Sequence, residues 1–213
     1  MMKAFAKQYF DILTNDLKGL NLTRILDFDS FYQKQILDSY LPYDESIEFQ
    51  NAIQNAKYRV DIGFGGGFPL LVLAKHLPDI YFYGLEARGK KAEAVKLIAQ
   101  KLEINNVSPM HQRLEMVLWD QPTCLTFKAV GTINEFLQKV YATAPIKVFF
   151  YKGPQFFDLE WDNISKLKNW KIIENREIVI EGIDKRYLIG LSSEGNVPRG
   201  TKNLVNFSQL IAY

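Results

Sequence analysis

The chain has 213 residues, a formal net charge of +2 at pH 7 and a single cysteine, Cys124. This length suits one domain with an added segment, and no stretch approaches the roughly 18 apolar residues of a membrane-spanning helix. The charge is too small to indicate nucleic-acid binding, and one cysteine excludes an internal disulfide and a multi-thiolate metal site. We therefore expect no bound metal. We also expect a cytoplasmic location, since residues 1–20 lack the apolar core of a signal peptide.

Residues 1–56 show apolar positions three and four apart, which predicts an N-terminal helical cap. From residue 57, β-branched and aromatic runs alternate with amphipathic stretches, as in a mostly parallel sheet covered by helices. The predicted order is strand 57–63, helix 68–77, strand 80–86, helix 89–103, strands 107–111 and 124–130, helix 133–142, strand 146–152, helix 157–169 and strands 170–182 and 184–193. The last two strands predict an antiparallel hairpin at the sheet edge. The predicted core thus covers 57–192 and a loop-like tail covers 193–213.

Residues 60–69, VDIGFGGGFP, end the first strand and contain four glycines. Open α/β sheets bind ligands at the carboxyl ends of their strands, and glycine lets a ligand lie against the main chain. A dinucleotide-binding G-x-G-x-x-G frame starting at Gly63 would require glycine where Phe68 stands. A P-loop would require a Gly-Lys-Ser/Thr ending, which is absent. The segment matches neither of these phosphate-binding motifs.

An acidic residue followed by Gly-x-Gly-x-Gly resembles the first motif of S-adenosylmethionine-dependent methyltransferases with a Rossmann-like sheet. This cofactor has a ribose diol and a sulfonium cation but no phosphate. Asp61 can favour the cationic end of the cofactor by electrostatics or by bonds to loop amides. Glu86 ends the second strand at about the 20-residue distance expected for a carboxylate that binds ribose hydroxyls. Two alternatives stay open: a tight turn beside a solvated Glu86, and an NAD-type site.

Several short motifs follow one another from about residue 20 to about residue 202. They are LNLTR (20–24), QILDS (35–39), the Phe-Pro end of the glycine loop (68–69), GKK (89–91), QRLE (112–115), FKAV (127–130), YKG (151–153), KRYLIGL (185–191) and PRGTKN (198–203). Their order closely resembles the bacterial methyltransferases that modify N7 of a guanine in small-subunit (16S) ribosomal RNA, the G-type or glucose-inhibited division protein B family. This chain has Gln35, Lys128 and Tyr187 where that family has histidine, arginine and histidine.

The resemblance implies a Rossmann-like S-adenosylmethionine-dependent methyltransferase fold preceded by N-terminal helices that cover the cofactor cleft. It implies an rRNA (guanine-N7)-methyltransferase whose partner is small-subunit ribosomal RNA or the assembling ribosomal subunit, and we expect a monomer. The cofactor-binding residues are then Asp61, Gly63, Gly65, Gly67, Phe68, Glu86, Leu114, Glu115 and Lys128, with Leu114 and Glu115 around the adenine.

Basic side chains at the predicted strand ends are the candidate acceptor contacts. Residues 86–152 carry 10 basic and 6 acidic side chains, so the positive charge is concentrated around the proposed site. Lys128 and Lys152 end neighbouring strands, and together with the family motifs this makes them the candidate catalytic residues. Arg113, Arg186 and Arg199 are candidates for RNA binding.

The acceptor chemistry is compatible with the absence of a histidine or carboxylate dyad. Guanine N7 carries a lone pair and no proton, so its methylation requires no general base, and rate enhancement would come mainly from orientation. Two other functions stay open. The first is a methyltransferase with a small-molecule or protein acceptor, and the second is a non-enzymatic Rossmann-like nucleotide-binding module.

Overall fold

A seven-stranded sheet forms the centre of the molecule, with the order β3-β2-β1-β5-β7-β9-β8. The computed structural model describes residues 2–164, 166–195 and 203–212. The strands of this sheet are β1 (Tyr58–Ile62), β2 (Phe82–Glu86), β3 (Val107–His111), β5 (Thr123–Lys128), β7 (Ile146–Lys152), β8 (Lys171–Ile178) and β9 (Arg186–Ser193). The first five are parallel, and β9 is antiparallel to both β7 and β8. The predicted mostly parallel sheet with an antiparallel edge hairpin is confirmed.

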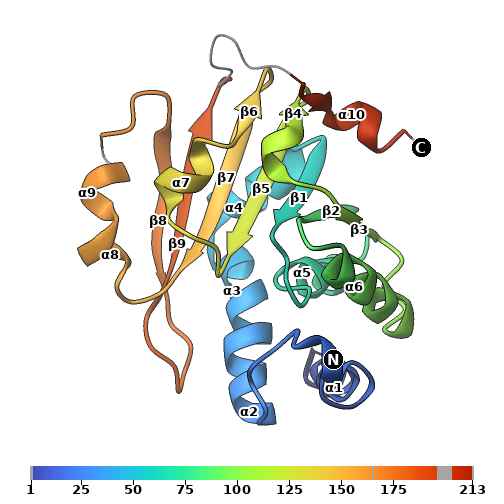
Figure 1. Cartoon of the computed structure of the whole chain (residues 1–213). Helices are drawn as coiled ribbons and strands as arrows, with labels where there is room; N and C mark the ends of the chain where they lie inside the picture. Colours follow the sequence, from blue (N-terminus) through green and yellow to red (C-terminus); the bar gives the residue numbers. More distant parts are fainter. Residues whose placement is uncertain (1, 165, 196–202, 213) are drawn as a thin grey trace.

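Helical segments cover both faces of this sheet and the carboxyl ends of its parallel strands (Figure 1). The N-terminal segments are α1 (Met2–Asp11), the π-helical turn η1 (Ile12–Asp16), the 3₁₀ turn η2 (Lys18–Leu20), α2 (Phe28–Phe31), the π-helical turn η3 (Tyr32–Leu37), α3 (Asp38–Glu45) and α4 (Ile47–Asn55). The later segments are α5 (Leu70–His76), α6 (Gly89–Lys101), the 3₁₀ turn η4 (Leu114–Met116), α7 (Ile133–Leu137), α8 (Phe156–Leu159), α9 (Trp161–Ile164) and α10 (Phe207–Leu210).

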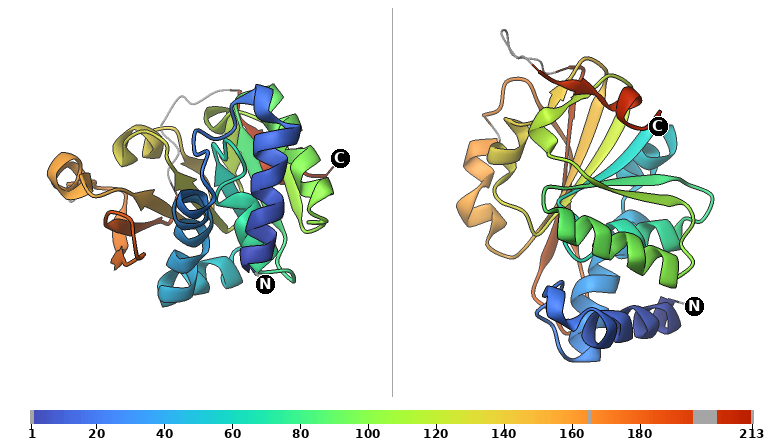
Figure 2. Two further views of the ribbon diagram at one scale, coloured as in Figure 1. Left: turned by 90° about the horizontal axis from the view of Figure 1, so that it is seen from below. Right: turned by 45° about the vertical axis from the view of Figure 1, so that its right-hand side comes forward.

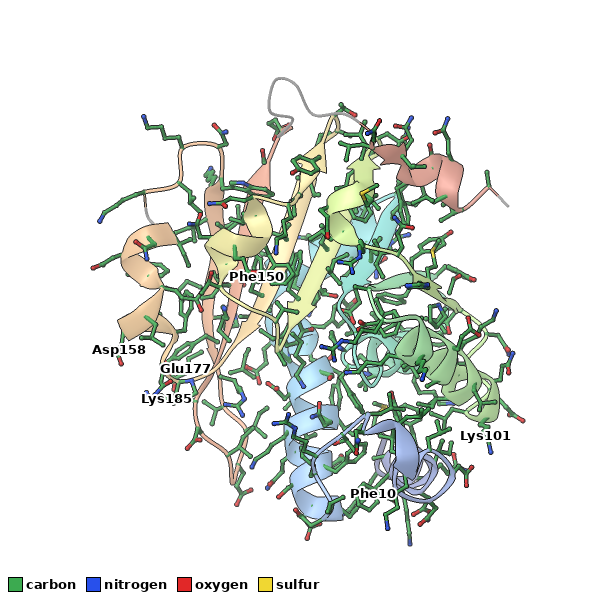
Figure 3. All side chains as sticks on the ribbon, in the orientation of Figure 1. Phe10, Lys101, Phe150, Asp158, Glu177 and Lys185 are labelled. Carbon is green, nitrogen blue, oxygen red and sulfur yellow. The ribbon has the colours of Figure 1, made fainter. Side chains whose placement is uncertain are left out.

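The two faces of the sheet belong to two apolar clusters because successive residues of a strand point to opposite faces. In β7, Phe149 packs with the N-terminal helices, α4 and α5, whereas Phe150 packs with α7, α8 and α10. Figure 3 shows Phe150 in the middle of the sheet. Both phenylalanines are fully buried. The aromatic richness of this strand therefore serves core packing.

The N-terminal helices lie at the carboxyl ends of the parallel strands. In Figure 1 the arrows of β1 and β5 point down toward α2 and α3, and both views of Figure 2 place the N-terminal segment against this edge. Side-chain caps define two helix starts, since Asp27 accepts from the Ser30 amide and Ser46 accepts from the Phe49 amide. The amphipathic α1 buries Phe5 and Tyr9, and the Tyr9 ring packs on Phe31 and Phe68.

A second, three-stranded sheet was not expected from the sequence. It has the order β10-β4-β6 and consists of β4 (Val117–Trp119), β6 (Tyr141–Ala142) and β10 (Val205–Asn206). The helix expected over 133–142 ends at Leu137 because the following residues pair with β4. The described part of the tail is held by Phe207, which is fully buried against Trp119. Tertiary packing therefore overrides the local helical pattern here.

Within the described part of the chain, we find no helix whose length and apolar character would let it span a bilayer.

Candidate active site

The glycine loop after β1 lines a cavity at the carboxyl edge of the sheet. Gly63 and Gly65 have φ angles of +70° and +54°, in the left-handed region that glycine adopts without strain. The cavity measures about 390 Å³, within the range of small-molecule sites. Its lining residues are Leu22, Gln35, Gly63, Phe64, Gly65, Gly66, Phe68, Glu86, Arg88, Lys91, Lys128 and Ala129. This is the site at which the sequence predicts the cofactor, and we refer to it as the cofactor cavity.

Gly66 and Gly67 are required by the N-terminal segment that packs on the loop. A Cβ atom at Gly66 would lie 2.6 Å from the main-chain oxygen of Leu22, and one at Gly67 would meet the Tyr9 hydroxyl. That hydroxyl donates a hydrogen bond to the Gly66 oxygen, and the Tyr9 ring stacks on Phe68 at 4.9 Å. Gly67 does not line the cavity. Its lack of a side chain has a packing reason, and its predicted contact with the cofactor stays a prediction.

Glu86 ends β2 and faces the loop from the neighbouring strand. Its two carboxylate oxygens accept hydrogen bonds from the main-chain amides of Gly65 at 3.1 Å and Arg88 at 3.0 Å. The residue is 8% exposed and lines the cavity. A carboxylate has about four acceptor positions, so Glu86 ties the loop to β2 with two of them and has about two left beyond these amide bonds.

Asp61 lies beneath the loop and does not line the cavity. One of its oxygens accepts from the Thr126 hydroxyl at 2.7 Å, and the other accepts from the Leu70 amide at 3.2 Å. Burial raises the pKa of this carboxyl to about 7, although the bonds from Thr126 and Leu70 and the charge of Lys128 lower it. Asp61 therefore anchors the end of β1 to β5 and α5, and it can act on a bound cation only through space.

A second cavity of about 290 Å³ adjoins the first. It is lined by Lys34, Gln35, Asp38, Lys128, Ala129, Tyr151, Lys152, Gly153 and Arg186. Gln35, Lys128 and Ala129 line both cavities and form the wall between them. We refer to this second hollow as the acceptor cavity. Two neighbouring strand ends, the hairpin and the N-terminal helices meet there. The sequence predicts that Lys128 and Lys152 share this edge, and the structure adds Arg186 from the hairpin.

Lys128 is buried at the junction of the two cavities. Its ammonium group donates to the Lys34 oxygen at 2.8 Å and to Gln35 Oε1 at 3.2 Å, and it lies 3.1 Å from Asp38 Oδ2. The ammonium group has three N–H donors, and three oxygens surround it. Gln35 and Lys128, two of the three positions at which the chain differs from the family pattern, are therefore in direct contact.

The other predicted basic residues have different surroundings. The Lys152 ammonium group pairs with Glu160 at 2.6 Å and donates to the Gly131 oxygen at 3.1 Å. Arg186 places Nε 3.6 Å from Asp38 Oδ1. Both side chains line the acceptor cavity, and both are held by carboxylates. An incoming anion would have to compete with these carboxylates for the two cations.

Besides Asp61 and Gly67, four more predicted residues lie outside the two cavities or outside the described residues. Arg113 follows β3 as predicted, but its side chain is exposed and contacts Glu115 at 3.5 Å. Leu114 is buried in the apolar cluster around the second sheet, and neither it nor Glu115 lines the cofactor cavity. Arg199 lies outside the residues that the structure describes. The adenine-binding and RNA-binding roles of these residues stay predictions.

Three basic residues line the cavities without having been assigned a role from the sequence. Arg88 and Lys91 line the cofactor cavity, and Lys34 lines the acceptor cavity. The GKK motif after Glu86 includes Lys91, so that signal was present but had no role attached. Nothing in the sequence pattern marks Lys34, because only the folding of the N-terminal helices onto β5 brings it to the site.

Known proteins resemble this chain over most of its length. The family model described as GidB, rRNA small subunit methyltransferase G, matches residues 2–180. A ribosomal RNA small subunit methyltransferase G from Petrotoga mobilis is 32% identical, covering 90% of this chain and 87% of its own. One from Mycoplasma capricolum is 30% identical, covering 84% and 77%.

The chain belongs to this family. The resemblance seen in the sequence motifs is thereby confirmed. Among solved structures, the magnesium protoporphyrin IX methyltransferase of Synechocystis PCC 6803 with bound SAH has a TM-score of 0.57 at 15% identity, covering 91% of this chain and 100% of its own. At that identity the match supports the fold alone, and it confirms the Rossmann-like methyltransferase fold.

Proposed function

We propose that this member of the G family transfers a methyl group from S-adenosylmethionine to N7 of a guanine in small-subunit ribosomal RNA. The observation that carries the proposal is the pair of adjoining cavities at the carboxyl edge of the sheet. One is lined by the glycine loop and Glu86, and the other by Lys34, Lys152 and Arg186. A methyl donor in the first cavity and a base in the second would lie next to each other, beside the residues Gln35, Lys128 and Ala129 that line both cavities.

The residues of the first cavity fit the cofactor. Glu86 can accept bonds from the ribose hydroxyls with the lone pairs that the loop amides leave free. The main chain of Gly63 and Gly65 leaves room for the methionine part, and Phe64 and Phe68 supply apolar contact. When bound, S-adenosylmethionine supplies an electrophilic methyl group whose bonding electrons stay on sulfur after transfer.

The second cavity fits an RNA nucleotide. Four of its lining side chains are cationic, and Asp38 is the one acidic side chain among the described residues that line it. Cations at such a site can neutralise the phosphates of the RNA. A base that is to be methylated has to leave the stack to enter a pocket of this kind. We propose that Lys34, Lys152 and Arg186 contact phosphates. Lys152 has to leave its ion pair with Glu160 to do so.

The protein's chemical contribution is orientation. N7 attacks with a lone pair and loses no proton, so no residue of the acceptor cavity has to act as a base. The product base carries a positive charge, so a carboxylate near the ring would favour the transition state over the ground state. Because three oxygens already surround the Lys128 ammonium group, we propose that Lys128 positions the wall between the cavities rather than contacting the reacting base.

The partner, oligomeric state and location belong to the same proposal. We propose that the protein acts in the cytoplasm as a monomer, on ribosomal RNA or on the assembling small subunit. Both cavities lie within a single chain, which supports a site that is complete without a second copy.

The test uses purified protein, methyl-labelled S-adenosylmethionine and small-subunit RNA or subunits from a strain that lacks the gene. Nucleoside analysis should find the label in 7-methylguanosine at one position. Glu86→Gln should weaken cofactor binding by about 10-fold or more, since it removes a charged acceptor, whereas the surface substitution Glu48→Gln should not. Cofactor binding without transfer to RNA would contradict the RNA proposal. A folded protein that does not bind the cofactor would contradict the enzymatic function altogether.

A further inference from the structure

One oxygen of a buried carboxylate in the acceptor cavity has no hydrogen-bond partner. Asp38 is 5% exposed and lines this cavity. Its Oδ2 lies 3.1 Å from the Lys128 ammonium group, but Oδ1 accepts no hydrogen bond within the described residues. The nearest charged group, Arg186 Nε, lies 3.6 Å away, beyond hydrogen-bond distance. Buried polar atoms are almost always paired, so Oδ1 indicates an N–H or O–H donor that arrives with a ligand.

A hydrogen-bond donor with no partner among the described residues lies three residues before Asp38. Gln35 lines both cavities, and its Oε1 accepts from the Lys128 ammonium group. An ammonium group can only donate, so the amide oxygen must face Lys128 and the amide nitrogen is directed elsewhere. No hydrogen bond within the described chain uses Gln35 Nε2. Gln35 Oε1 and Asp38 Oδ2 lie 3.2 Å and 3.1 Å from the same Lys128 ammonium group, so Gln35 and Asp38 present a donor and an acceptor side by side.

This pair matches one purine and not the other. On the six-membered ring of guanine, the acceptor O6 stands next to the donor N1–H. Adenine has the reverse order, with the N6 amino donor next to the acceptor N1. A donor beside an acceptor on the protein is therefore complementary to guanine, and with adenine it would set donor against donor and acceptor against acceptor.

We propose that Gln35 and Asp38 read the acceptor base, with Gln35 Nε2 donating to O6 and Asp38 Oδ1 accepting from N1–H. This inference rests on the proposed function, since it assigns a base to the acceptor cavity. Lys128 acts as the positioning residue, because it holds the amide of Gln35 and the carboxylate of Asp38 at once. Contacts at O6 and N1 are on the six-membered ring and leave N7 free for the methyl group.

Arg186 has to move aside for this contact. Its Nε lies over Asp38 Oδ1, and its side chain is 20% exposed, so it can reach solvent. A phosphate of the entering RNA offers the guanidinium group a bidentate partner, and the carboxylate in turn gains the N1–H donor. Asp38 also favours the reaction itself. As N7 gains the methyl group, positive charge spreads over the ring and N1–H becomes a better donor to the carboxylate.

The experiment compares guanosine with 1-methylguanosine, which keeps O6 and N7 but has no N1–H. The methylated guanine is first located in wild-type reactions with small-subunit RNA. RNAs with either nucleoside at that position are then assembled by ligation, and kcat/KM is measured for both. Wild type should prefer guanosine by roughly 10- to 100-fold, the range of one base-specific contact. In Asp38→Ala the preference should fall below about threefold, because the acceptor is gone and its space admits the methyl group.

Two variants serve as controls. Gln35→Ala removes the O6 donor and leaves Asp38, so it should lower both rates and keep their ratio. Asp44→Asn changes an aspartate of the same helix that pairs with His76, 2.7 Å away and outside the cavity, and it should keep both rates. Binding of S-adenosylmethionine, measured by calorimetry, shows whether each variant is folded.

Three outcomes overturn the inference. Equal rates of wild type on the two nucleosides would exclude an N1–H contact without recourse to any variant. An unchanged preference in folded Asp38→Ala would show that Asp38 only holds Lys128 in place. Failure of wild type to methylate N7 of any guanine would overturn the proposed function together with the base-reading pair. This failure would be seen in the first reactions with small-subunit RNA, before the modified RNAs are made.

Discussion

Five of the twelve residues that line the cofactor cavity belong to one continuous loop, residues 63–68, whereas the acceptor cavity is lined mainly by charged side chains from separate segments of the chain. In the first, Gly63 and Gly65 make room by having no side chain. In the second, Lys128, Asp38 and Arg186 hold one another through ion pairs. A substitution in the loop should therefore act through steric contact, and one in the acceptor cavity through unpaired charge.

Lys128→Ala should have the largest effect, because it removes the cation at the wall between the cavities. The Lys128 and Asp38 side chains are each 7% exposed, so the substitution leaves a buried carboxylate with only the distant Arg186. Breaking a buried pair in this way costs about 3–5 kcal/mol of unfolding free energy. Urea denaturation measures the loss, and Lys128→Arg, which keeps the charge, should recover most of it.

The matched control for this prediction is Lys147→Ala. Lys147 pairs with Glu48 at 3.9 Å, and both side chains are more than 40% exposed. Surface pairs of this kind contribute less than about 1 kcal/mol. Equal losses in the two variants would mean that the charges in the acceptor cavity are solvated, which would remove the contrast between the two cavities.

Gly66→Ala tests whether a substitution in the glycine loop of the cofactor cavity acts through steric contact. The added Cβ would lie 2.6 Å from the Leu22 oxygen and 3.3 Å from the Phe68 ring. Overpacking against main chain should lower the unfolding free energy by about 1–3 kcal/mol, and it should weaken cofactor binding because the loop has to shift. Thermal denaturation and calorimetry measure the two effects.

Gly19→Ala provides the comparison, because a Cβ there meets no atom within 4 Å. Its unfolding free energy should change by less than about 0.5 kcal/mol. If Gly66→Ala were as stable as Gly19→Ala, the N-terminal segment could not be packed on the loop as described.

The two cavities also differ in how much the sequence predicts. The glycine spacing and Glu86 predict a cofactor site at this edge of the sheet, and the structure has a cavity there that Gly63, Gly65 and Glu86 line. This much follows from the sequence because the strand, the loop and the next strand are close in sequence and follow local rules. The acceptor cavity depends on contacts between residues about 90 positions apart, such as Lys128 with Gln35. A strand-end rule predicts that Lys128 and Lys152 share an edge, but it cannot predict which carboxylate holds each of them.

The same limit explains the parts of the fold that the sequence did not predict. Hydrophobic periodicity correctly predicts the seven strands of the main sheet, because each carries its own β-rich run. The second sheet has strands of two or three residues, too short for any periodicity. Gly66 had no reason in the sequence, since its neighbours Tyr9 and Leu22 come from the N-terminal helices.

The pH dependence of the unfolding free energy tests whether the buried Asp61 anchors the end of β1 beneath the glycine loop. Burial raises the pKa of its carboxyl from the ordinary 3.8 to about 7, so the folded protein binds a proton that the unfolded chain has released between these values. The contribution of Asp61 to the unfolding free energy is therefore complete below about pH 4, and it falls by up to about 1.4 kcal/mol per pH unit until about pH 7. Asp61→Asn should flatten this slope in denaturation curves measured at pH 5, 6 and 7. An unchanged slope would assign the pH dependence to other groups.

Arg113→Ala should have the smallest effect on stability, and it decides whether the charged surface extends beyond the acceptor cavity. The Arg113 side chain is 64% exposed and its contact with Glu115 is 3.5 Å, so the unfolding free energy should change by less than about 0.5 kcal/mol. If Arg113 contacts an RNA phosphate, the slope of log affinity against log salt should fall by about one in binding measurements. Lys101→Ala is the control, because this exposed lysine at the end of α6 pairs with Asp16 and lines neither cavity. Identical salt slopes in the two variants would confine the RNA-binding cations to the acceptor cavity, and the predicted role of Arg113 would then be wrong.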